Sequence, residues 1–136
     1  MAYYKWIGHA EIVLEDYHRS KRLLHQIELD EIYRAHKADG MPRAYLVRDT
    51  VGNVVIRMTT GRANMLRQEI DAVDAVRRGL REKEKDKGKL ELLNLMWLER
   101  RLPLYAACDL LGIGYRTGSR WKREILQRLA RELGWI

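Results

Sequence analysis

Residues 102–123 constrain the fold of this chain more than any other stretch. Apolar or small residues recur from 104 to 111, Gly112 follows, and a second segment with helical spacing begins near Tyr115. Glycine adopts a positive φ without steric cost, so Gly112 suits the corner between two short helices. Such helices also need small residues where they cross, and Ala107 and Cys108 supply them. The stretch therefore predicts a helix-turn-helix.

The second helix of this pair is predicted to be amphipathic, with a basic face. Offsets of one, four, five and eight residues from Tyr115 place four polar residues on one side of a helix: Arg116, Ser119, Arg120 and Arg123. The segment from Tyr115 to Glu132 contains six basic residues and two acidic ones. A charged helix end is usually only a solvated surface. Combined with the turn and a net charge of +7, however, this helix indicates a phosphate-lined partner.

Length and composition limit the class of protein. A chain of 136 residues suits one compact domain, or a small DNA-binding module with a helical extension. The net charge of +7 indicates a polyanionic partner, either nucleic acid or a membrane surface. No apolar run reaches the ~18–20 residues of a membrane span, and residues 1–10 lack the apolar core of a signal peptide. The single cysteine suits a reducing cytosol, so we expect a cytoplasmic protein without a membrane partner.

Two long amphipathic helices are expected in the first part of the chain. Residues 3–37 carry a heptad seam, and residues 60–87 carry a second stripe that ends in a run of alternating charges. The two stripes predict an antiparallel helical hairpin. The seam consists of Trp6, Ala10, Val13, Tyr17, Ser20, Leu24 and Ile27, and the second stripe consists of Ala63, Leu66, Ile70, Val73, Val76 and Leu80.

Residues 41–61 form the tip of this predicted hairpin. They hold two groups of β-forming residues, at 45–47 and 54–56, on either side of a turn-like segment. Two strands alone are marginally stable in water. The pattern fits either a small β-hairpin or a partly ordered loop.

The last third of the chain is expected to form a separate module. We expect Gly88 to break the chain, residues 90–98 to form a helix buried on several sides, and Pro103 to start the next helix. The final helix should end at Gly134. The prediction is a mostly α protein, with a helical hairpin over 1–87 and a helix-turn-helix module over 89–136.

The segment 104–135 resembles the terminal module of phage late-gene transcriptional regulators of the RinA and ArpU type. The resemblance rests on the LLGI turn, the RWKR and LQRLA runs, and the ELGW ending. These modules are in turn similar to the promoter-reading region 4 of sigma factors. The resemblance covers about the last third of the chain well and the middle loosely. It implies sequence-specific binding to double-stranded DNA upstream of late genes, inside a host bacterial cell.

The resemblance also implies roles for individual residues. Two positions depart from the family pattern: Gly114 stands where a Ser or Thr usually caps the helix, and Gly118 where a Val or Ile usually packs. Either the two helices approach very closely at Gly118, or the second helix begins later. Core positions fall on Ala107, Leu111, Ile113 and Trp121. Groove-facing positions fall on Tyr115, Arg116, Ser119, Arg120 and Arg123, and Lys122 and Arg128 are expected with Arg123 near the phosphates.

Other chemical signals in the sequence are weak. His18, His25 and His36 share a helical stripe, but not the spacing of metal ligands on one helix. Cys108 has no base nearby in sequence and suits a packing role. The glycines at 112, 114 and 118 lack the strand that precedes a nucleotide-binding loop. We therefore expect no enzyme, no metal and no cofactor.

The most specific functional prediction is a DNA-binding transcriptional regulator that activates phage late genes. Activation would need contact with host RNA polymerase. The alternatives are a packaging protein resembling a small terminase subunit, and a helical scaffold that binds an acidic protein. Because the first helix, 3–37, is longer than the second, 60–87, by about seven residues, or ~10 Å, apolar seam residues should be left exposed. We therefore expect a homodimer or higher oligomer.

Overall fold

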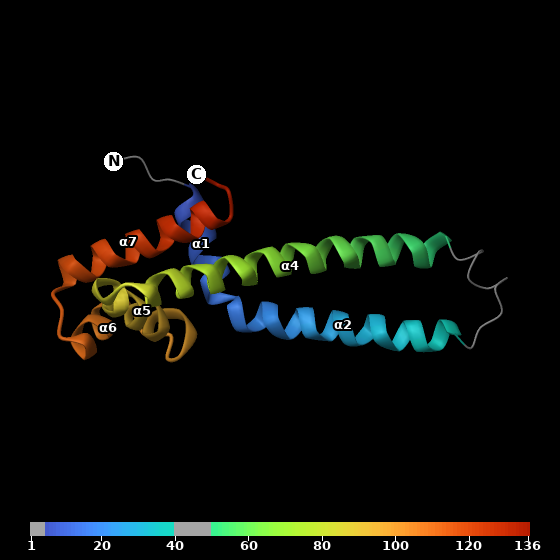
Figure 1. The fold of residues 1–136 in the computed structure, drawn as a ribbon, viewed down its shortest axis with the longest axis horizontal. Helices are drawn as coiled ribbons and strands as arrows, with labels where there is room; N and C mark the ends of the chain where they lie inside the picture. The colour runs from blue at the N-terminus through green and yellow to red at the C-terminus, as the bar shows by residue number, and fades with distance from the viewer. Residues whose placement is uncertain (1–4, 40–49) are drawn as a thin grey trace. The chain divides into compact units, whose positions relative to one another are not determined.

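The structure, a computed structural model, describes residues 5–39 and 50–136, and most of these residues are helical (Figure 1). No strand occurs in these ranges, so the mostly α class is confirmed. None of the described helices combines the length and apolar composition that a membrane span requires. The elements are α1 (Lys5–Glu15), α2 (Tyr17–Asp39), α4 (Thr50–Glu82), the 3₁₀ turn η1 (Glu84–Asp86), α5 (Lys87–Leu93), the π-helical turn η2 (Asn94–Leu98), α6 (Leu104–Leu111) and α7 (Tyr115–Glu132).

The predicted first helix is divided into two helices. α1 ends at Glu15 and α2 begins at Tyr17, although the backbone N–H of Asp16 still donates to the carbonyl of Ile12 at 2.9 Å. The apolar residues Ala10 and Val13 are buried in α1, which packs against α7 and η2. The prediction of one continuous helix over 3–37 is therefore wrong, and the first half of its seam packs against α7 and η2.

The segment expected to be a hairpin or loop is helical where it is described. α4 begins at Thr50, so the predicted strand at 54–56 is wrong, while residues 41–49 lie outside the described range. β-branched residues favour strands only weakly, and Ile56 and Thr59 continue the three- and four-residue spacing of the stripe that follows. With 33 residues, α4 is longer than α2 with 23. The expected excess length of the first helix is therefore not present, and the oligomer stays a prediction.

The chain divides into two compact units. Unit 1 comprises residues 1–18 and 69–136, and unit 2 comprises residues 19–68. These units do not coincide with the predicted halves, 1–87 and 89–136. In unit 2, Glu28 of α2 and Arg67 of α4 form an ion pair at 3.5 Å, and the side chains of Ser20, Ala63 and Leu66 are buried.

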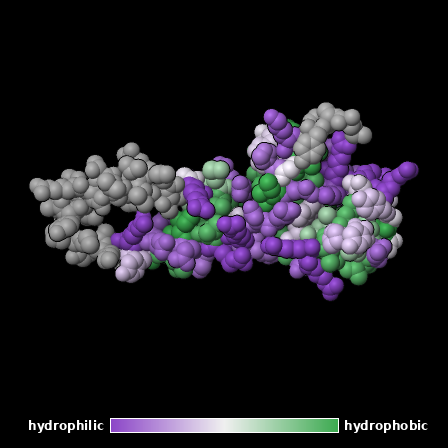
Figure 2. All heavy atoms as spheres, turned by 180° about the vertical axis from the view of Figure 1, so that it is seen from behind, coloured by the Kyte–Doolittle hydropathy of each residue, from purple (hydrophilic) through white to green (hydrophobic). Residues whose placement is uncertain are grey.

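The core of unit 1 draws apolar side chains from α1, α4, α5, η2, α6 and α7. Burial of such side chains is the main favourable contribution to folding. On the side of the molecule seen in Figure 2, hydrophilic residues are interspersed with apolar ones over the described surface. The largest fully buried apolar side chains are Leu14, Val73, Leu80, Leu92, Leu93, Ile125 and Leu129.

Three residues join α6 to α7. Gly112 has a φ of 68°, its N–H donates to the carbonyl of Asp109, and the N–H of Ile113 donates to the carbonyl of Cys108 at 3.1 Å. This pair of hydrogen bonds, with glycine in the left-handed conformation, is the Schellman arrangement that ends many helices. The turn predicted at Gly112 is confirmed.

Gly118 lies where α7 meets α6. A Cβ atom at this position would lie 2.2 Å from the Sγ atom of Cys108, and the N–H of Gly118 donates to the carbonyl of Gly114 at 2.9 Å. The helix therefore begins at Tyr115, and the close approach explains the glycine. Of the two explanations offered by the sequence, the structure supports the close approach.

Gly88 allows a second close contact with α7, which here involves α5. It lies inside α5, and a Cβ atom there would lie 2.8 Å from Cη2 of Trp121. The expected chain break at Gly88 is wrong. The residue is small because the indole ring of Trp121 lies directly against the backbone of α5.

The contact between Gly118 and Cys108 can be tested by substitution. Alanine is the better helix former by ~1 kcal/mol, but we expect Gly118→Ala to lower the free energy of unfolding by about 1–3 kcal/mol through overpacking. Gly79→Ala is the control, since its Cβ would meet only Arg128 at an ordinary 3.7 Å, and should be neutral or stabilising. Urea denaturation measures both. Cys108→Ala should recover part of the loss, and an unchanged stability in Gly118→Ala would contradict the close approach.

Candidate nucleic-acid interface

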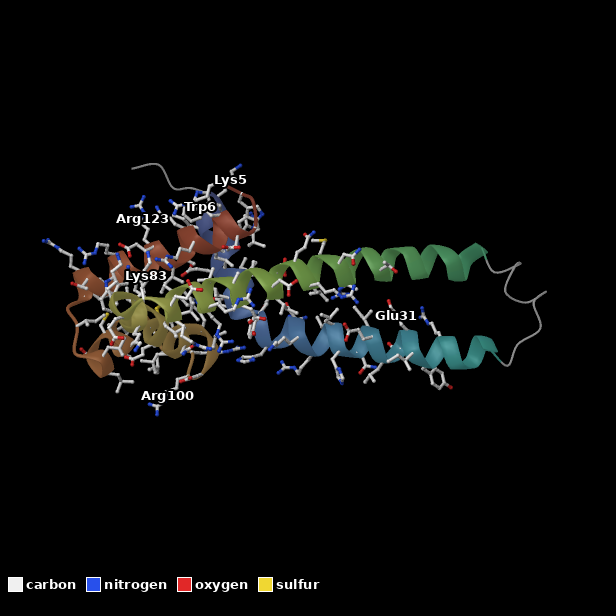
Figure 3. The ribbon with its side chains drawn as sticks, viewed as in Figure 1. Lys5, Trp6, Glu31, Lys83, Arg100 and Arg123 are labelled. Atoms are coloured by element: carbon white, nitrogen blue, oxygen red, sulfur yellow. The ribbon has the colours of Figure 1, made fainter. Side chains whose placement is uncertain are left out.

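Helix α7 presents one buried side to the core and one exposed side to solvent. Gly118, Ile125, Leu126, Leu129 and Ala130 are buried. The opposite side carries the residues predicted to face a groove: Tyr115, Arg116, Ser119, Arg120 and Arg123 are all exposed, with 63% of Tyr115 accessible. Figure 3 shows Arg123 directed away from the helical core of unit 1. The structure thus brings these five residues together on one surface.

The electrostatic character of this surface follows from the sequence of α7. Between Tyr115 and Arg123 there are four basic residues and no acidic one. The first carboxylate of the helix belongs to Glu124, whose Oε2 atom forms an ion pair with Nζ of Lys89 in α5 at 2.6 Å. Positive charge on the exposed side is therefore not cancelled from within the first half of α7.

Two predicted phosphate-binding residues lie elsewhere on α7. Nζ of Lys122 is 2.7 Å from a carboxylate oxygen of Glu11 on α1, and Nη2 of Arg128 is 3.1 Å from a carboxylate oxygen of Asp86. Both basic side chains are only partly exposed. Their charges serve to attach α7 to neighbouring segments of unit 1.

The buried carboxylate of Asp86 is the centre of this attachment. It is fully buried, and it accepts hydrogen bonds from Lys89 and Arg128, both at 3.1 Å. Burial by itself raises the pKa of Asp86, but the hydrogen bonds and charges of Lys89 and Arg128 together hold it below its ordinary value. The hydrogen bond to Glu124, opposed by burial and assisted by Asp86, raises the pKa of Lys89.

The alternating charges of residues 81–87 gave no indication of this network. The sequence predicts a solvated helix end there, yet one member of the run, Asp86, is fully buried. No apolar spacing distinguishes it from its exposed neighbours Glu84 and Lys85. Its partners lie in α5 and α7, and only the tertiary fold brings them together.

A surface pocket of about 560 Å³ lies beside α7 in unit 1. Lys122 and Glu11 line it, and their ion pair has been described above. Arg101, also in the lining, has a φ of 51° and donates to the carbonyl of Glu15 at 3.4 Å. Much of the charge around this pocket thus serves contacts between segments of the chain itself.

The cysteine and the histidines that could serve as a nucleophile or as metal ligands lie in different parts of the fold. Cys108 is buried against Gly118, and burial, followed by the charge of Asp109, raises the pKa of its thiol. His18 lies 2.7 Å from the carbonyl of Leu98 through its Nε2 atom, and His25 is exposed. Within the described ranges, no three His, Cys, Asp or Glu side chains come together in a group that could hold a metal ion.

Comparison with known protein families, with curated proteins and with solved structures finds no match for this chain. The geometry of α7 and its charges therefore carry the functional argument.

Asp86→Asn tests the network that attaches α7. The amide keeps the shape of the side chain but removes the charge facing Lys89 and Arg128, so we expect the free energy of unfolding at pH 7 to fall by about 3 kcal/mol. Because the folded pKa of Asp86 is lowered, its contribution is present above the unfolded value of about 3.9 and is lost as pH falls toward the folded pKa. The difference from the unmodified protein should therefore shrink below about pH 4.

The control is Glu84→Gln, two residues away on the exposed surface, where the ion pair with Lys87 should matter little. Urea denaturation between pH 3 and 7 gives the comparison. Equal stability of Asp86→Asn and Glu84→Gln at pH 7 would show that the buried carboxylate is not needed.

Proposed function

We propose that this chain is a sequence-specific DNA-binding transcriptional regulator, and that α7 is the helix that enters the major groove. The observation that carries the proposal is the exposed side of α7 over residues 115–123, which bears basic and polar side chains and no carboxylate. Its position after α6 and the left-handed Gly112 is also that of a recognition helix.

The chemistry of this surface suits a DNA groove. An arginine guanidinium can donate two hydrogen bonds to the O6 and N7 atoms of guanine, and a serine hydroxyl can bond to several base edges. Arg116, Ser119 and Arg120 lie in the first half of α7, where recognition helices contact bases. Lys122 and Arg128 are bound by Glu11 and Asp86, so we leave them out of the proposed DNA contacts.

The biological setting follows from the resemblance to RinA- and ArpU-type regulators. It supports activation of phage late genes in a bacterial cytoplasm, with host RNA polymerase as a further partner. A homodimer would offer two recognition helices to half-sites about one DNA turn, or ~34 Å, apart. Mapping the sites bound on the native genome would identify the regulated genes.

Arg120→Ala tests sequence reading by α7. If Arg120 reads a guanine edge, its loss should reduce discrimination between preferred and altered sites by about 1–3 kcal/mol. The preferred duplex is first selected from a randomised library with the unmodified protein, and discrimination is then measured by competition shift assay. Arg120→Lys should restore it only in part, because a lysine ammonium lacks the planar, preorganised pair of donors of a guanidinium.

Arg100→Ala is the matched control for Arg120→Ala. It also removes one exposed positive charge, and Figure 3 shows Arg100 on the side of unit 1 away from Arg123. We expect Arg100→Ala to keep the sequence preference. A preference that survives equally in Arg120→Ala would count against base reading by this residue.

A further inference from the structure

Helix α7 carries a stripe of basic residues longer than the surface predicted from the sequence. Arg120, Arg123, Gln127 and Arg131 follow Arg116 by four, seven, eleven and fifteen residues, so the five lie on one side of the helix. All four arginines are exposed, and Gln127 is half-buried. We call this set the arginine stripe.

Arg131 resembles Arg116 and Arg120, and differs from Arg128, in the absence of an ion-pair partner within the described ranges. Among the residues that the structure describes, the side chains of Arg116, Arg120 and Arg131 have no ion-pair partner. The side chain of Arg128, by contrast, contacts the carboxylate of Asp86. The positive charge of Arg131 thus remains available to a partner of this surface.

The carboxylate beside the stripe is already neutralised. Glu124 follows Arg123 directly, and it would face the same solvent region if it were unpaired. Its Oε2 atom lies 2.6 Å from Nζ of Lys89, whose side chain is only 16% exposed. The ion pair with Lys89 of α5 therefore offsets the charge of this carboxylate, so Glu124 does not cancel the positive charge of the neighbouring arginines.

The stripe extends well beyond the part of α7 proposed to read bases. α7 has 18 residues, which makes it about 27 Å long, and Arg131 lies about 16 Å along the axis from Arg120. A recognition helix contacts base edges with its N-terminal residues. A straight helix also leaves a groove that curves around the duplex, so Arg131 would lie beyond the base-reading residues, near the phosphates that border the groove.

We propose that Arg131 is a phosphate-binding residue, and that the arginine stripe divides its tasks along α7. The inference rests on the proposed function. Arg116 and Arg120 contact base edges, whereas Arg131 binds a backbone phosphate of the same duplex and fixes how far α7 enters the groove. Phosphate contacts position a protein on DNA without reading sequence.

Fluorescence anisotropy with a labelled mixed-sequence duplex of about 25 base pairs tests this division. Arg131→Ala should weaken binding, and the loss should shrink about 3.5-fold between about 50 and 200 mM salt, because one phosphate contact changes the log–log slope by ~0.9. Arg131→Lys keeps the charge and should bind nearly as well as the unmodified protein. Arg100→Ala serves again as the control, and circular dichroism verifies that each variant is folded.

A second measurement separates Arg131 from the base-reading residues. On selected and altered duplexes, Arg131→Ala should lose affinity by the same factor, whereas Arg120→Ala should lose mainly the preference. If Arg131→Ala binds like Arg100→Ala while Arg120→Ala is impaired, the inference fails and the proposed function stands. If the unmodified protein does not bind the duplex, both fail.

Discussion

The position of α7 depends on the buried carboxylate of Asp86. A carboxylate without water is stable only when charged donors surround it, and Lys89 and Arg128 provide them. Lys89 also holds Glu124, so one network joins η1, α5 and α7. The same network determines which charges of α7 remain available to a partner. Arg128 and Glu124, which both belong to α7, form ion pairs within this network, so their charges are already compensated.

Two glycines and one ion pair complete the support of α7. Gly118 allows α7 to approach Cys108 of α6, and Gly88 allows Trp121 to lie against α5. On a third side, Lys122 binds Glu11 of α1. A helix supported from three directions can present its exposed side in a fixed orientation, which a recognition surface requires.

Local rules predicted the parts of the fold that depend on local chemistry. The turn at Gly112 follows from backbone conformation, and the exposed side of α7 follows from helical spacing, so both could be predicted from neighbouring residues. The break at Asp16 and the burial of Asp86 depend on packing between distant segments, which spacing does not record. For the same reason the sequence did not predict the ion pairs of Lys122 and Arg128, because their partners Glu11 and Asp86 are distant in sequence. The helix over 50–61 contains β-branched residues that favour strands, so local strand propensity conflicts there with the helical spacing that the tertiary fold follows.

The central claim, that the exposed side of α7 binds duplex DNA through its charges, is tested most directly by the salt dependence of binding. The unmodified protein is titrated with a mixed-sequence duplex at several salt concentrations between about 50 and 200 mM. The four arginines of the stripe, two near the phosphates and two in the groove, would together neutralise two to four phosphate charges, which predicts a log–log slope between about −2 and −4. A slope near zero over this range, or no binding at the lowest salt concentration, would contradict the claim.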